Sequence, residues 1–235
     1  MLIREAMSVF WQTLKDVWEE LYSIGMVNLV WLFAWALPAG IVLGTGIEVL
    51  IIPAIILSVG LFTVTTSGVY YVANRVAHGK TFHFVDFVDG IKKLWWRSLI
   101  WGVVNIIVVY MIYLNLQFYP QMIKSNWVIL IGGFWVSVLV FWTVMQIYFW
   151  PLLVEQEETK MLLAWRNAAY LILVNPFYAF FVTSFAVLLL AISVGTTLPF
   201  VFIGMGVQAL LGSNAALTLL YKVGVTEDPR PKPGQ

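Results

Sequence analysis

Long apolar stretches without a charged residue alternate with short segments that hold nearly all of the charges. The charge-free stretches are residues 21–47, 49–74, 98–123, 125–154 and 167–221. A transmembrane helix needs about 20 apolar residues to cross the bilayer, and every stretch is at least that long. The last stretch has room for two helices, and its segment 195–199, with glycine and proline, favours a turn between them. The pattern predicts an all-α transmembrane helical bundle of six spans.

These spans divide the chain into three parts. Residues 1–23 are expected to form an amphipathic helix at the membrane surface, residues 24–225 the six-span domain, and the proline-rich residues 226–235 a disordered tail. The predicted spans are Ile24–Thr45, Val49–Asn74, Leu99–Gln117, Trp127–Val154, Pro176–Val194 and Leu198–Tyr221.

Lysine and arginine are divided very unequally between the two sides that these spans define. Of the 13 lysine and arginine residues, all but Lys124 lie in the terminal segments and in the loops on the same side as the termini. Cytoplasmic loops of membrane proteins carry an excess of these residues. We therefore expect both termini to be cytoplasmic.

Three segments before spans have the periodicity of helices that lie in the membrane surface. In the first, apolar residues recur every three or four positions from Ile3 to Leu21, with Lys15, Asp16 and Glu19 on the solvated face. The second runs through residues 82–95 and the third through residues 161–171. These segments are interpreted either as ordinary connections or as surfaces that dock a membrane protein partner.

The same three segments share a short sequence pattern. In each, a tryptophan lies ten residues before the asparagine of a Val-Asn pair. The pairs are Trp18 with Asn28, Trp95 with Asn105, and Trp165 with Asn175. This repeat predicts three helical hairpins, each preceded by an interfacial helix, around a pseudo-threefold axis normal to the membrane.

Several segments resemble the YesL-like family of bacterial integral membrane proteins, a domain of unknown function. They are Trp35–Pro38 (WALP), Ser67–Lys80 (SGVYYVANRVAHGK), Phe84–Gly102 (FVDFVDGIKKLWWRSLIWG) and Trp165–Pro176 (WRNAAYLILVNP). The resemblance covers most of the chain. It implies a place in the bacterial cytoplasmic (inner) membrane and an association with carbohydrate uptake, and the family has no assigned catalytic residues.

The charged segments offer little that could carry chemistry. The absence of cysteine excludes thiolate metal sites, and a net charge of +1 argues against binding nucleic acid. His78, His83, Asp86 and Asp89 have no trusted metal-ligand spacing. Phosphate loops and Ser-His-Asp sets do not occur in the sequence. We expect no catalytic residues, no cofactor and no metal site, and therefore no enzyme.

The segment between the second and third spans is expected to contact anionic lipid headgroups. Its lysine and arginine residues exceed its aspartates by three, and it lies beside the membrane surface. The candidate headgroup contacts are Lys80, Lys92, Lys93 and Arg97.

Amide side chains are the main polar groups expected inside the membrane. They are Asn28, Asn105, Asn175, Gln146, Gln208 and Asn214. Such groups usually hydrogen-bond to neighbouring helices, which is the structural interpretation. The alternative is that they line a path for a neutral, sugar-like solute. The Gly40-x3-Gly44 motif is interpreted as packing within the chain rather than as a dimer interface.

Two functions follow from these features. The first is a non-catalytic accessory or assembly subunit in the membrane, linked by the resemblance to carbohydrate uptake. It is favoured by the interfacial segments and by spans without ionisable residues. The second is a carrier or facilitator for a neutral solute such as a sugar, favoured by the amide side chains.

Overall fold

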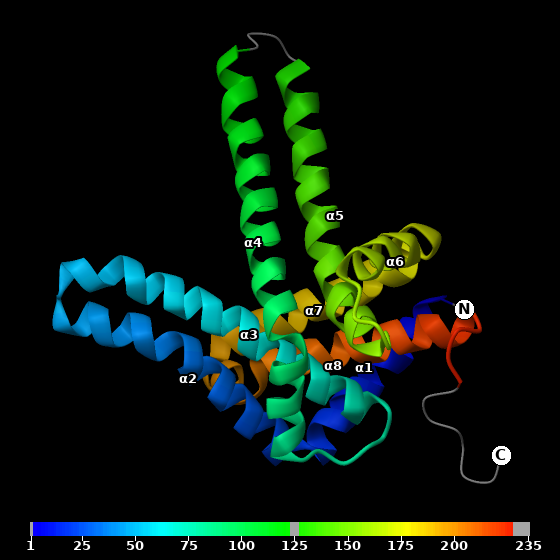
Figure 1. The fold of residues 1–235 in the computed structure, drawn as a ribbon. Coiled ribbons are helices and arrows are strands. Elements are labelled where there is room, and N and C mark those ends of the chain that lie inside the picture. The colour runs from blue at the N-terminus through cyan, green and yellow to red at the C-terminus, as the bar shows by residue number, and fades with distance from the viewer. Residues whose placement is uncertain (1, 123–126, 228–235) are drawn as a thin grey trace.

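The computed structural model describes residues 2–122 and 127–227, which are almost entirely helical (Figure 1). In chain order the elements are α1 (Leu2–Glu19), α2 (Leu21–Thr45), the 3-10 helix η1 (Glu48–Leu50), α3 (Ile51–Ala77), α4 (Phe84–Met122), α5 (Trp127–Glu155), α6 (Met161–Val174), α7 (Pro176–Thr196) and α8 (Leu198–Lys222). Within these described residues, six helices are long and apolar enough to cross a membrane, namely α2, α3 with η1, α4, α5, α7 and α8. The predicted six-span all-α bundle is confirmed. Most of the predicted tail, residues 228–235, lies outside the described residues.

The connections between helices follow from local backbone chemistry. At the end of α3, Gly79 has a φ of 68°, and its N–H donates to the Val76 carbonyl at 2.8 Å. The next N–H, of Lys80, donates to the Arg75 carbonyl at 3.0 Å, which completes a Schellman motif. The predicted turn between α7 and α8 is also present. It is centred on Thr197, which has a φ of 58°, a region that β-branched residues rarely adopt.

The spans form three hairpins, α2–α3, α4–α5 and α7–α8 (Figure 1). Two of the three predicted interfacial helices are separate helices, α1 and α6. The prediction of a separate surface helix over residues 82–95 is wrong, because α4 continues unbroken from Phe84 to Met122. Its first turns contact α3, where Phe87 lies against Gly68 and Gly90 against Tyr71, so they extend the span.

The three hairpins differ in how much of their surface the chain covers. The α2–α3 and α4–α5 hairpins project from a common base as two diverging arms (Figure 1). In the base, α8 packs against α1, α2, α3, α5 and α7, and it is the most buried of the six spans. Spans α4 and α5 are the least buried. The hairpins are therefore not equivalent in packing, although their connectivity repeats.

Helix α1 packs against α7 and α8 through a face that its apolar periodicity does not indicate. Thr13 and Asp16 are buried on this face. The prediction that Asp16 lies on the solvated face is wrong: it is 3% exposed, and the Asn214 amide of α8 donates to its carboxylate at 2.9 Å. Lys15 and Glu19 are exposed as expected and form an ion pair.

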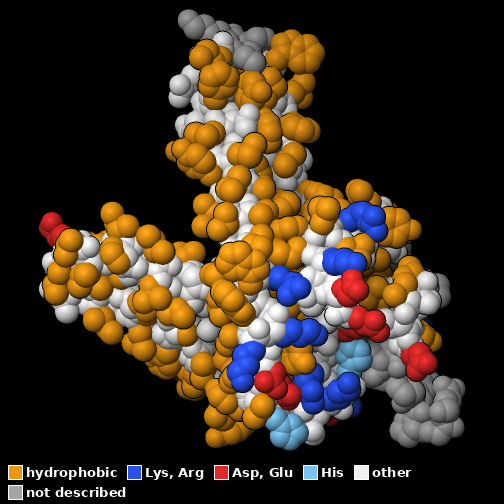
Figure 2. All heavy atoms as spheres, in the orientation of Figure 1, with side chains coloured by type: hydrophobic (Ala, Val, Ile, Leu, Met, Phe, Trp, Pro, Cys, Tyr) orange, Lys and Arg blue, Asp and Glu red, His pale blue; other side chains and the backbone are white. Residues whose placement is uncertain are grey.

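Charged side chains gather over the base, whereas both arms are mostly apolar on the face that Figure 2 shows. We call this region the charged end; it comprises α1, the end of α3, the start of α4, the end of α5, α6 and the end of α8. Glu48 is an exception, because it lies in η1 at the tip of the α2–α3 arm. On this face the charged side chains are therefore concentrated where the helices of the base end, away from the apolar arms.

Cysteine labelling of the natively cysteine-free chain tests the predicted orientation. We expect Thr81→Cys, in the loop between α3 and α4, to react with a membrane-impermeant maleimide only after the cells are permeabilised. Glu48→Cys, at the tip of the α2–α3 arm, should react in intact cells. The opposite labelling pattern would show that the lysine and arginine distribution does not set the orientation.

Candidate functional site

Asn28 makes the most extensive contacts of the amides predicted inside the membrane. It is fully buried on α2, facing α8. Its amide nitrogen donates to the Phe200 carbonyl at 3.0 Å and to the Val201 carbonyl at 2.7 Å. Its carbonyl oxygen accepts from the N–H groups of Met205 at 2.7 Å and Gly206 at 3.2 Å. Every hydrogen-bonding group of this side chain therefore joins α2 to α8, with no donor left for a solute.

These four partners are backbone groups one turn apart on α8. In an uninterrupted α-helix the Met205 N–H donates to the Val201 carbonyl. Here the Asn28 amide contacts both of those groups, so it is inserted into the backbone ladder of α8. Insertion of a side chain into this ladder is an established cause of helix bending. Asn28 consequently supports the backbone of a neighbouring span.

The middle hairpin is joined by a reciprocal set of tryptophan and amide contacts. On α4, Trp101 and Asn105 are one turn apart, and on α5 so are Trp142 and Gln146. The Trp101 indole donates to the side-chain oxygen Oε1 of Gln146 at 2.8 Å, and the Trp142 indole donates to Oδ1 of Asn105 at 2.9 Å. Each amide nitrogen then donates to the carbonyl of the tryptophan on its own helix, at 2.8 Å for Asn105 and 3.0 Å for Gln146.

The remaining candidate amides lie in three different settings. Gln208 of α8 donates to the Ala186 carbonyl of α7 at 2.9 Å, within the third hairpin. Asn214 of α8 donates to α1, as described above. Asn175 lies at the junction of α6 and α7 rather than inside a span, and it donates to the Leu171 carbonyl at 3.3 Å. The structure does not bring the three repeat asparagines to one site.

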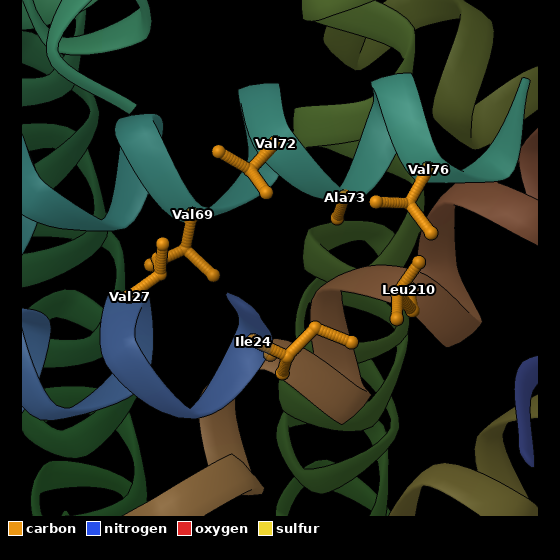
Figure 3. A pocket seen from close by; sticks show the side chains of 8 residues that line it. Ile24, Val27, Val69, Val72, Ala73, Val76 and Leu210 are labelled. Carbon is orange, nitrogen blue, oxygen red and sulfur yellow. The ribbon is translucent and has the colours of Figure 1, made fainter. Parts of the chain in front are cut away.

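A small cavity lies between α2, α3 and α8 (Figure 3). Its volume is about 10 Å³, and its walls include Ile24, Val69, Ala73 and Leu210. A water molecule needs about 10–15 Å³ and at least two polar partners. An all-apolar cavity of this size therefore stays dry and has no room for a sugar.

Larger hollows lie on the outer faces of the helices. One groove of about 530 Å³ follows α2 from Leu29 to Pro38, with Phe33 and Leu37 in its wall. Further along α2, the prediction that Gly40 and Gly44 serve packing within the chain is wrong. A Cβ atom on either glycine would meet no atom within 4 Å in the part of the chain that the structure describes, so the two glycines bring no other helix into close contact.

Polar side chains join three helices at the charged end. Arg75 of α3 lies 3.2 Å from Asp86 of α4. Glu155 at the end of α5 accepts a hydrogen bond from Asn74 of α3 and lies 3.4 Å from the ring of His78, which directly follows α3. Within residues 2–122 and 127–227, no group of three or more His, Asp or Glu side chains could hold a metal ion. These contacts link helix ends to one another.

The four predicted headgroup contacts are divided between two places. Lys92, Lys93 and Arg97 lie on one turn of α4. Lys80 instead lines a separate polar cleft of about 250 Å³, which Asp16, Glu19 and Glu20 also line. Carboxylates repel a phosphate, so the environment of Lys80 differs from that of the other three.

Comparison with known proteins adds no relative. The chain matches no family model, no curated protein and no solved structure. The resemblance to the YesL-like family therefore stays a prediction.

Two features of the polar network were not anticipated from the sequence. One is the role of indole groups as donors between spans: beyond the α4–α5 contacts, Trp31 donates to Thr66 at 3.0 Å between α2 and α3. A spacing of four residues between a tryptophan and an amide, as in Trp101 and Asn105, is the signal that could have indicated it. The other is the burial of Asp16, because the apolar periodicity of residues 1–23 placed this residue on the solvated face.

Proposed function

We propose that this chain is a non-catalytic assembly subunit that holds a transmembrane helix of a partner protein against the exposed face of α2. The proposal rests on the uncovered surface of α2 at Gly40 and Gly44, which we call the seam. Small residues four positions apart allow the backbones of two membrane helices to approach closely. The glycines of the base are already used in this way, as at Gly90, where Tyr71 lies against the backbone. Gly40 and Gly44 are four positions apart, and a Cβ atom on either would meet no atom of the described residues within 4 Å.

The surroundings of this seam fit a helix better than a small solute. The groove from Leu29 to Pro38 continues along the same helix and is apolar, so it suits the side chains of a second helix. Gly132 and Gly133 of α5 are equally open, but they are adjacent in sequence and lie on different faces of their helix. The resemblance described above suggests that the partner belongs to carbohydrate uptake.

Copurification with matched variants tests this proposal. We expect the wild-type chain, purified in mild detergent from its native host, to retain one membrane protein in fixed stoichiometry. The double variant Gly40→Leu/Gly44→Leu should lose that protein, because leucine side chains would fill the seam. Its own stability should not fall, since a Cβ atom at either position would meet no atom of the described residues within 4 Å. The control Gly132→Leu/Gly133→Leu makes the same change on α5 and should retain the partner.

Two outcomes would contradict the proposal. Equal loss of the partner from both double variants would show that the seam on α2 is not the interface. A chain that purifies alone and transports a neutral solute in liposomes would instead support the carrier alternative. That alternative has less support, because the interior amides described above hydrogen-bond within the chain.

A further inference from the structure

One turn of α4 concentrates positive charge at the point where the helix becomes apolar. Lys92, Lys93 and Arg97 lie within six residues, together with Trp95 and Trp96. The two lysines are exposed, and the tryptophans are 50% and 58% exposed. From Ser98 onward α4 contains no charged residue. Because α4 is continuous here, this turn directly precedes the membrane-crossing part of the same helix.

The cations of this turn have no carboxylate partner, unlike four other cations of the charged end. The ion-paired lysine and arginine residues are Lys15 with Glu19, Arg75 with Asp86, Lys160 with Glu158, and Lys222 with Glu5. Within the part of the chain that the structure describes, no carboxylate oxygen lies within 4.0 Å of the charged nitrogens of Lys92, Lys93 or Arg97. The nearby acidic residue Asp89 is exposed and pairs with none of them.

Two of these cations are nevertheless held in place. The Lys93 ammonium group lies 5.8 Å from the centre of the Tyr71 ring of α3. The Arg97 Nε donates to the Thr159 carbonyl, between α5 and α6, at 2.6 Å. Lys93 and Arg97 are four residues apart on one face of α4, where like charges destabilise a helix unless an anion lies between them.

The membrane supplies such an anion at this depth. Exposed tryptophans next to a span prefer the level of the lipid headgroups, and Trp95 and Trp96 share the turn with the cations. Their neighbours Lys92 and Lys93 then lie at the level of the phosphates. Anionic lipids in the cytoplasmic leaflet attract lysine and arginine beside a span.

We propose that Lys93 and Arg97, flanked by Lys92, bind the phosphate of an anionic phospholipid. The bound lipid would neutralise the repulsion along α4. Arg97 also donates to the Thr159 carbonyl, so the bound lipid would also stabilise the connection between α5 and α6. Lys80 is not part of this site, because its cleft contains three carboxylates.

Thermal unfolding of the full chain in lipid nanodiscs tests the site. We expect nanodiscs that contain phosphatidylglycerol to raise the Tm by several degrees over phosphatidylcholine alone, because a ligand that binds only the folded state stabilises it. The variant Lys92→Gln/Lys93→Gln should lose most of this shift. The control Lys15→Gln/Lys160→Gln removes the same charge from the same end, at ion-paired positions, and should keep the shift.

Three results would overturn the proposal. The first is no rise in Tm with phosphatidylglycerol in the wild-type chain. The second is equal loss of the shift in both double variants, which would indicate an effect of net charge alone. The third is a comparable rise when inorganic phosphate is added to phosphatidylcholine nanodiscs, which would assign the turn to a soluble phosphate ligand.

Discussion

Replacing Asn28 by leucine should lower the free energy of unfolding by about 2–4 kcal/mol, on the basis of four lost hydrogen bonds and the desolvation of their partners. Leucine has the same number of side-chain heavy atoms and a similar branched shape, but it neither donates nor accepts. The variant therefore leaves the carbonyls of Phe200 and Val201, and the N–H groups of Met205 and Gly206, without the side chain that contacts them. If α8 re-forms its own backbone hydrogen bonds in the variant, part of the lost unfolding free energy is recovered. We therefore expect no more than about 4 kcal/mol.

The matched control is Asn115→Leu on α4. Asn115 is also an asparagine in a span, but it is only half-buried, and its side chain donates to the Met111 carbonyl of its own helix. We expect its unfolding free energy to change by less than about 1 kcal/mol. Reversible unfolding of both purified variants by SDS in mixed micelles, followed by tryptophan fluorescence, measures the difference. Equal effects at the two positions would show that the insertion of Asn28 into α8 contributes little stability.

The repeated Val-Asn pattern shows where a sequence pattern is informative and where it fails. It predicts polar residues that join helices, and Asn28 and Asn105 do so. It also suggests three equivalent environments, which the structure does not contain. Asn28 follows a break between α1 and α2, Asn105 lies inside an unbroken α4, and Asn175 ends α6. Identical short sequences adopt different structures here because the tertiary neighbours differ.

Span lengths and loop positions could be predicted because they depend on local composition. A run of apolar residues must cross about 30 Å of hydrocarbon whatever its neighbours are, so all six spans were located. The faces of the helices could not be predicted in the same way. In lipid an apolar residue suits the bilayer as well as the core, so periodicity gave no sign that the Gly40 face is open. Asp16 was misplaced for the related reason that its burial depends on a tertiary contact, the hydrogen bond from Asn214 of α8.

The packing of α3 on α4 gives the second large effect. Gly90 of α4 lies directly against α3, and a Cβ atom at this position would be 2.5 Å from the Tyr71 Cβ and 3.3 Å from the Gly68 Cα. Both are positions that a rotamer change does not move, so the two helices must separate. We expect Gly90→Ala to lower the free energy of unfolding by about 2–3 kcal/mol, the upper part of the range for overpacked cores.

Gly132→Ala on α5 is the control for this substitution, because a Cβ atom there would meet nothing within 4 Å. Alanine favours the helix by up to about 1 kcal/mol over glycine, so the control should be as stable as the wild type or more so. The same SDS unfolding assay applies to both. Separation of α3 from α4 should also weaken the contact between Arg75 and Asp86, which lies beyond Gly90 at the charged end. Unchanged stability of Gly90→Ala would show that the α3–α4 seam tolerates a side chain at Gly90.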